Sequence, residues 1–196
     1  MPTTLELLRA DALTCTRCKL ADAGRTQVVF GVGDPASDLL FIGEGPGAEE
    51  DRLGEPFVGK SGKKLDKLVL DELGVTRERF YIANVVKCRP PGNRDPQPDE
   101  IEACRPWLEQ QLDLIAPKVI ITLGKFAAQL LLDTKVGITK LRGREHPYRD
   151  GVLIPTWHPA YVLRGGAVPE AEMRADLVRA KLALARAGSP LVGAAS

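Results

Sequence analysis

The sequence predicts an α/β protein in which helices cover a parallel sheet. Four short, β-rich runs are apolar almost throughout instead of alternating, a pattern typical of parallel strands buried on both faces. These runs are residues 38–43, 80–86, 118–123 and 151–156. Helical patterns follow each run, at residues 62–73, 98–115, 124–132 and 169–187. Because strands alternate with helices along the chain, we expect a layered α/β domain.

The size and composition of the chain fit one soluble domain. The chain has 196 residues, of which 44% are hydrophobic and 27% are charged, as in ordinary globular proteins. We expect residues 1–187 to form the domain and residues 188–196 to form a flexible tail. The apolar runs are too short to span a membrane, and the N-terminus does not resemble a secretory signal. These features predict a cytoplasmic protein with no membrane association, and the absence of long arms predicts a monomer.

The distribution of charge is more informative than its sum. The net charge is +1, but residues 135–149 carry five basic residues against one acid. A local positive surface of this kind could hold a phosphate backbone despite the near-neutral total. On charge alone, solvated loop residues remain the simpler interpretation.

The four cysteines favour a metal site over disulfides. Cys15 and Cys18 have C-x-x-C spacing, whereas Cys88 follows a predicted strand and Cys104 lies in a predicted helix. Four thiolates suit zinc or an iron–sulfur cluster, and disulfides are uncommon in a chain without a secretion signal. Four unrelated buried thiols are the alternative, and spacing alone does not identify the metal.

Three loops at the carboxyl ends of the predicted strands carry the unusual residues. They are residues 43–47 (GEGPG), 87–93 (KCRPPGN) and 157–166 (WHPAYVLRGG). Right-handed crossovers place the ligand site of such a sheet beyond these strand ends. The glycine-rich loop is neither a dinucleotide-binding fingerprint nor a phosphate-binding P-loop. We therefore expect function in these loops, but not nucleotide binding of those two kinds.

Three single residues are candidates for ligand contact. Asn84 lies in an apolar run, where a buried amide needs partners, and its one acceptor and two donors could pair with a donor and an acceptor of a bound ligand at once. Phe57 is a lone aromatic between prolines and glycines, and His158 follows a strand, where it could donate to an oxygen that gains charge. Taken singly, a loop-capping asparagine, a core phenylalanine and a bystander histidine are the simpler readings.

Together and in this order, these elements resemble the family 4 uracil-DNA glycosylases. The resemblance rests on CTRC, GEGPGAEEDRLGEPFVGKSG, NVVKCRPPGNRDPQPDE, a later cysteine and a final HPxxxL, and runs from about Cys15 to Leu163. It implies a three-layer α/β/α sandwich around a four-stranded parallel sheet. It also implies an enzyme that flips uracil out of single- or double-stranded DNA and hydrolyses its N-glycosidic bond in base excision repair.

The resemblance assigns roles to particular residues. A [4Fe–4S] cluster would be held by Cys15, Cys18, Cys88 and Cys104. Phe57 would stack on the base, Asn84 would read its pairing edge and His158 would face O2. The remaining residues expected to contact uracil are Gly43, Glu44, Gly45 and Glu50, the last of which would crowd a 5-methyl group and exclude thymine. The residues expected to contact DNA are Lys60, Ser61, Leu163 and Arg164.

The chain departs from the broader superfamily at two positions. Gly45 stands where many members have a water-activating aspartate, which leaves the general base open, with Glu44 as the neighbouring acid. Ala160 stands where the common motif HPS has its serine, so a hydroxyl contact to phosphate is missing. A covalent uracil-trapping mechanism is not expected, because the loop after Asn84 carries no inserted histidine.

Two other functions remain open from the sequence. A non-catalytic damage-binding member of the superfamily would fit the missing aspartate and serine, although the trio of Asn84, Phe57 and His158 argues against it. A zinc module that binds nucleic acid would need neither Asn84 nor His158. We expect the cluster to tie loops together structurally, with a redox role as the alternative.

Overall fold

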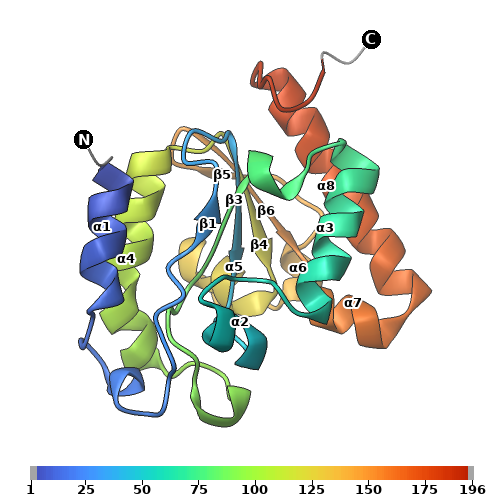
Figure 1. Cartoon of the computed structure of the whole chain (residues 1–196). Coiled ribbons are helices and arrows are strands. Elements are labelled where there is room, and N and C mark those ends of the chain that lie inside the picture. The colour runs from blue at the N-terminus through green and yellow to red at the C-terminus, as the bar shows by residue number, and fades with distance from the viewer. Residues whose placement is uncertain (1–3, 194–196) are drawn as a thin grey trace.

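The computed structural model describes residues 4–193, which form one six-stranded sheet with helices on both faces (Figure 1). The strand order is β1-β3-β2-β4-β6-β5. The strands are β1 (Val32–Gly33), β2 (Leu39–Gly43), β3 (Tyr81–Asn84), β4 (Val119–Leu123), β5 (His146–Tyr148) and β6 (Gly151–Thr156).

The sheet is mixed and has six strands, two more than the four-stranded sheet that was expected. The four predicted strands β3, β2, β4 and β6 are adjacent and parallel to one another. Two further strands, β1 and β5, pair antiparallel at the two edges. They have only two and three residues, too few for the hydrophobic pattern by which a strand is recognised in a sequence.

Between residues 4 and 193 the chain forms eight α-helices and three 3₁₀ turns. The α-helices are α1 (Thr4–Leu13), α2 (Ala48–Leu53), α3 (Lys60–Leu73), α4 (Pro98–Ile115), α5 (Lys125–Leu131), α6 (Ile138–Leu141), α7 (Pro159–Gly165) and α8 (Ala167–Arg186). The 3₁₀ turns are Lys19–Ala21, Arg77–Arg79 and Pro91–Asn93. Helices α3, α4, α5 and α8 correspond to the four predicted helices, whereas α1, α2, α6 and α7 were not predicted.

The central strand β2 shows why the sheet needs helices on both faces. Successive strand residues point to opposite faces, and Leu39 and Phe41 enter one hydrophobic cluster while Leu40 and Ile42 enter another. The first cluster is covered by α3, α7 and α8, and the second by α1, α4 and α5. Figure 1 shows α1 and α4 on one side of the sheet and α3 and α8 on the other. The fold therefore has three layers.

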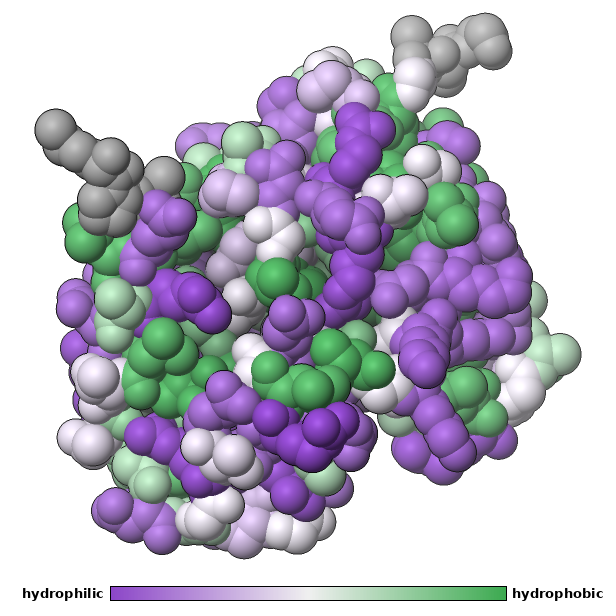
Figure 2. Space-filling view, viewed as in Figure 1, coloured by the Kyte–Doolittle hydropathy of each residue, from purple (hydrophilic) through white to green (hydrophobic). Residues whose placement is uncertain are grey.

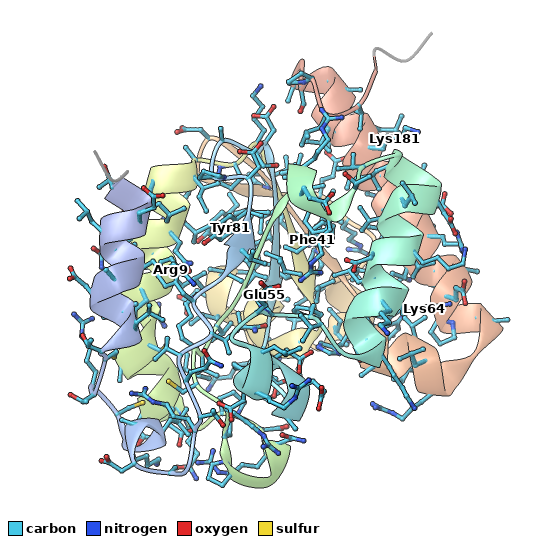
Figure 3. All side chains as sticks on the ribbon, in the orientation of Figure 1. Arg9, Phe41, Glu55, Lys64, Tyr81 and Lys181 are labelled. Atoms are coloured by element: carbon cyan, nitrogen blue, oxygen red, sulfur yellow. The ribbon has the colours of Figure 1, made fainter. Side chains whose placement is uncertain are left out.

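Ion pairs hold α3 and α8 together over the first cluster. The Lys64 ammonium lies 2.6 Å from a Glu170 carboxylate oxygen, and Lys181 donates to the carbonyl of Glu72 at 3.1 Å. Figure 3 shows Lys64 and Lys181 at opposite ends of this helix pair, with Phe41 beside it at the centre of the molecule. The contact between Lys64 and Glu170 fixes the start of α3, which borders the site described below, against the start of α8.

The segment predicted to be a flexible tail packs against the domain over its described part. Leu191 and Val192 are buried and belong to the first hydrophobic cluster, so these two residues of the predicted tail contact the domain. Residues 194–196 lie outside the described part of the chain. None of the helices between residues 4 and 193 is long and apolar enough to cross a lipid bilayer.

Candidate active site and cysteine site

A cavity of about 520 Å³ opens at the carboxyl ends of β2, β3 and β6. Figure 2 shows the surface indented at the lower edge, between the part that carries α2 and the part that carries α7. The cavity is large enough for a flipped nucleotide. Its lining comprises Glu44, Gly45, Pro46, Gly47, Glu50, Phe57, Ser61, Asn84, Pro90, Asn93, Arg94, Asp95, Pro96, His158, Ala160 and Arg164.

Asn84 is the last residue of β3, and its amide is buried at the wall of the cavity. The side chain is 1% exposed, and its Oδ1 has no hydrogen-bond partner within the described residues. A buried acceptor without a donor is costly. Gly43 lies directly behind it, since a Cβ at that position would come within 2.4 Å of Asn84 Oδ1 and 2.5 Å of Phe57 Cζ. Gly43 thus makes room for the two side chains that form the wall.

Phe57 is presented by an unusual loop. Its φ angle is +55°, a left-handed conformation that bulky residues rarely adopt. Glu50 stabilises this loop, because its Oε1 accepts from the backbone N–H groups of Val58 and Gly59, each at 3.1 Å. The ring of Phe57 is 6% exposed and its centroid lies 5.7 Å from that of His158. The loop therefore holds one aromatic face beside the histidine.

His158 is the N-cap of α7, and its ring orientation is set by that helix. The backbone N–H of Ala160 donates to Nδ1 of His158 at 3.2 Å. Burial, and secondarily the charge of Arg164, lower the pKa of His158 to about 4. The imidazole is therefore neutral at pH 7, and because Nδ1 accepts, the proton resides on Nε2. This tautomer makes His158 a hydrogen-bond donor.

Glu44 directly follows β2 and has an environment suited to proton transfer. Burial and, to a smaller extent, the negative charge of Asp95 raise the pKa of Glu44 to about 7, against the opposing effect of Lys125. Lys125 lies 3.7 Å from Asp95. A carboxyl group that titrates near neutrality can act as a base at physiological pH.

The cavity brings together most of the site residues predicted from the sequence. Glu44, Gly45, Glu50, Phe57, Ser61, Asn84, His158 and Arg164 line it, and Gly43 lies behind its wall. Lys60 and Leu163 are exposed and are not part of the lining. Lys60 is the first residue of α3 and Leu163 lies on α7. These two helices flank the opening.

Sequence reasoning missed the far side of the cavity, which is formed by residues 93–96. Arg94 is held there by a bidentate contact with Glu100, at 2.8 and 2.6 Å, and Glu100 is fully buried. The signal was available, since this segment directly follows the KCRPPGN loop. Only the fold, however, shows that it turns back to face Glu44.

The four cysteines surround a second, small cavity on the side of α4. Cys15, Cys18, Cys88 and Cys104 line it together with Arg17, Arg25, Lys87 and Trp107. All four cysteines are free thiols, so disulfide pairing does not explain their convergence. Among the described residues, no group of His, Cys, Asp or Glu forms a ready-made site for a single ion.

The surroundings of the sulfur atoms fit a thiolate-bound cluster. Arg25 Nη1 donates to Cys88 Sγ at 2.8 Å, the Lys87 backbone N–H to Cys104 Sγ at 3.2 Å, and Trp107 Nε1 to Cys15 Sγ at 3.3 Å. Hydrogen bonds to the sulfurs are a feature of iron–sulfur sites. Three cationic side chains around the cavity would offset the negative charge of four thiolates. The donor set therefore fits a group ligated by four cysteines.

Comparisons with known proteins identify the family of the chain. The family model described as the uracil DNA glycosylase superfamily matches residues 30–180. The type-4 uracil-DNA glycosylase of Thermotoga maritima is 47% identical over 162 residues, which cover 82% of this chain and 83% of that protein. The type-4 enzyme of Sulfurisphaera tokodaii is 43% identical, over 82% of this chain and 76% of its own length. The type-4 enzyme of Archaeoglobus fulgidus is 41% identical, over 82% of this chain and 83% of its own length. The chain belongs to the uracil-DNA glycosylase superfamily and, within it, to the type-4 family.

Proposed function

We propose that this chain removes uracil from DNA by flipping the nucleotide into the 520 Å³ cavity and hydrolysing its N-glycosidic bond. The observation that carries the proposal is the buried Oδ1 of Asn84, which lacks a donor among the described residues. The N3–H of uracil is a donor of the required kind. A base inside a duplex exposes neither this group nor its glycosidic bond, so the nucleotide must leave the stack.

The contacts of the base follow from the shape of the cavity. Asn84 would read the pairing edge with its amide, and the ring of Phe57 would stack on the base. Glu50 is held by two backbone N–H groups of the Phe57 loop. A carboxylate fixed in this way supports a steric role against the 5-methyl group of thymine. Gly43 and Gly45 would allow the base to approach the backbone closely.

The leaving group would be stabilised by His158. As the C1′–N1 bond breaks, the sugar becomes oxocarbenium-like and the electron pair of the bond passes to uracil, which leaves as an anion. His158 would donate from Nε2 to O2 without transferring its proton. A preorganised donor of this kind is worth about 2.7–4 kcal/mol of barrier in other enzymes.

Glu44 is the candidate for the general base. A water molecule that adds to C1′ must lose a proton, and the Glu44 carboxylate would accept it. The raised pKa of Glu44, about 7, supports this role, because a base that titrates near the working pH is most effective. Because position 45 is a glycine, Glu44 is the acidic residue that the loop of residues 43–47 contributes to the cavity.

DNA would be gripped by residues around the opening of the cavity. Lys60 and Ser61 begin α3, and we propose that they contact the backbone that flanks the flipped nucleotide. Leu163 and Arg164 lie on α7. Leu163 is 47% exposed, which suits an apolar wedge in the vacated base stack, with Arg164 beside it in the minor groove.

The cofactor is proposed to be a [4Fe–4S] cluster ligated by Cys15, Cys18, Cys88 and Cys104. Such a cluster supplies four metal–thiolate bonds that join segments distant in sequence. The ligands come from the loop after α1, the loop after β3 and helix α4. We infer a structural role, because these bonds would tie the N-terminal segment to the loop that carries the far wall of the uracil pocket.

The test is direct measurement of the released base. Purified protein is incubated with oligonucleotides that contain uracil, thymine or cytosine at one position, single-stranded and paired, and free base is quantified by chromatography. The proposal predicts release of uracil and no release of thymine. Tight binding of uracil-containing DNA without base release would instead identify a damage-binding protein.

A further inference from the structure

The two residues that precede His158 are both anchored to α8 by their side chains. Thr156 Oγ1 donates to Asp176 Oδ2 at 2.6 Å, and both residues are buried. Trp157 Nε1 donates to Glu172 Oε2 at 2.7 Å. Asp176 and Glu172 lie one turn apart on α8. The strand end that delivers His158 to the pocket is thus attached to a long helix at two consecutive positions.

Arg142 ties the two carboxylates of α8 together. Its guanidinium donates to both Asp176 oxygens, at 3.1 and 2.9 Å, and also to the Glu172 side chain and carbonyl, at 3.3 and 2.8 Å. The neighbouring Gly143 N–H donates to the Pro155 carbonyl at 3.2 Å. We call Arg142, Thr156, Trp157, Glu172 and Asp176 the Asp176 network. It satisfies a buried carboxylate with three charged or polar hydrogen bonds, which makes its geometry rigid.

The opposite side of the strand end is equally constrained. The Gly124 N–H donates to the Thr156 carbonyl at 3.0 Å. A Cβ at Gly124 would lie 3.2 Å from the Cβ of His158, so the histidine lies close against the residue that follows β4. Within the described residues, the His158 ring has one hydrogen bond, from the Ala160 N–H, and the His158 carbonyl accepts from the N–H groups of Tyr161 and Val162 at 2.8 and 3.2 Å. Its position therefore depends on α7 on one side and on what holds residues 156 and 157 on the other.

We propose that Thr156, through the Asp176 network, is a positioning residue that sets the orientation of the His158 imidazole. No member of the network lines the uracil pocket, so its effect on the reaction passes through His158 and α7. The inference rests on the proposed function only for its catalytic consequence. The positioning itself is a property of the protein without DNA. A loosened strand end weakens the Ala160–His158 contact and with it the preference for the Nε2–H tautomer.

The structure offers a matched control in Thr122. It is a buried threonine on the neighbouring strand β4, but its Oγ1 has no partner among the described residues. Substitution of either threonine by valine keeps the β-branched shape and removes a hydroxyl. Thr156→Val breaks a hydrogen bond to Asp176, whereas Thr122→Val breaks none. Thr156→Ser keeps the hydroxyl and should rescue the effect.

The test is ¹⁵N NMR of the histidine rings in the full-length protein, combined with single-turnover excision of uracil. The chain has only two histidines, and His146 serves as an internal reference. Thr156→Val should move the two ¹⁵N shifts of the His158 ring towards each other. It should also lower the rate constant of uracil excision about tenfold without changing KM for DNA, as expected for loss of one buried hydrogen bond. Thr122→Val and Thr156→Ser should leave both unchanged.

The outcomes separate the two proposals. Unchanged His158 shifts in Thr156→Val, or equal changes in Thr122→Val, would overturn the positioning role whatever the activity. Shifts that move as described in a protein that releases no uracil would leave the positioning intact and refute the glycosylase. If Thr156→Val does not fold, Trp157→Phe takes its place, because it removes the indole donor to Glu172, keeps an aromatic ring beside Tyr161 and changes a partly exposed residue.

Discussion

The side-chain ammonium of Lys87 donates to the backbone carbonyl of Asn84 at 2.9 Å, inside the protein. Lys87 is 1% exposed, lines the cysteine cavity, and its own backbone N–H donates to Cys104. Asn84 lines the cavity that we propose takes uracil. One buried side chain thus connects the two sites, which lie in different parts of the molecule but share the loop after β3.

Lys87→Met should impair uracil recognition. Methionine fills the space but leaves the Asn84 carbonyl without its donor, so the end of β3 is less firmly fixed. We expect kcat/KM for uracil-containing DNA to fall about tenfold, since an unpaired buried acceptor costs about 1–3 kcal/mol. Steady-state kinetics on a uracil oligonucleotide measure this. Lys118→Met, which removes the ion pair between the partly exposed Lys118 and Asp38, is the control. Equal losses in both variants would refute the specific role of Lys87.

Asp95→Asn should shift the pH dependence of the reaction. The pKa of Glu44 is about 7 partly because Asp95 is negative. A base acts when ionised, so kcat/KM in the wild type should rise with pH through about 7. Removal of the negative charge lowers the pKa of Glu44, and the rising limb should move to lower pH.

Lys125→Met gives the opposite sign, because Lys125 lowers the pKa of Glu44. Its rising limb should move to higher pH. The pH profile of kcat/KM for each variant is the measurement. If both variants kept the wild-type profile, Glu44 would not be the titrating base.

Gly43→Ala should abolish most activity, whereas Gly59→Ala should not. A Cβ at Gly43 would clash with Asn84 and Phe57, but at Gly59 the nearest atom is Glu50 Oε1 at 3.4 Å. Because displacement of positioning groups by about 1 Å can cost a hundredfold in rate, we expect a loss of about that size in Gly43→Ala. Kinetics and thermal melting of the two variants are compared. Wild-type activity in Gly43→Ala would show that Asn84 and Phe57 do not form the wall of the working pocket.

Cys88→Ser should remove the cofactor and destabilise the protein. Loss of one of four ligands releases the cluster, and with it the cross-link between the loops. Loss of a tightly bound group worth about 4 kcal/mol lowers the Tm of a domain of this size by about 10 °C. Iron and sulfide analysis, visible absorption and melting curves measure this. A colourless wild-type protein that contains zinc would contradict the iron–sulfur assignment and support a zinc site.

Much of the fold was predictable because its central strands are buried on both faces. Residues such as Leu39–Gly43, all buried, produce continuous apolar runs that indicate parallel strands. The edge strands β1 and β5 escaped prediction because they are too short to show a pattern. Helix α7 escaped because its seven residues were read as part of a loop. The buried Leu191 and Val192 lie after a glycine and a proline, a sequence context typical of a frayed end.

The candidate site was predictable where residue chemistry stood out, and not where only the fold brings residues together. Asn84 stood out as a polar residue inside an apolar run, and His158 as a histidine at the end of a predicted strand. Asp95 and Arg94 belong to an ordinary polar loop, and only the structure shows them opposite Glu44 in the cavity. The Asp176 network joins the residue after α6 and the end of β6 to α8 across more than thirty residues of sequence, a separation at which no sequence pattern indicates contact.

The glycosylase reaction and the role of His158 are tested together in a single-turnover assay on a labelled oligonucleotide with one uracil. Strand nicking after alkali treatment is compared for wild type, His158→Ala and His146→Ala. His146 lies on an edge strand, where its Nε2 contacts the Leu141 carbonyl, and is not part of the pocket lining. We predict uracil-specific nicking that falls about 10²–10³-fold in His158→Ala, as for loss of one donor to a developing anion, and is unchanged in His146→Ala. Equal activity in all three proteins, or no nicking by folded wild type, would contradict the account.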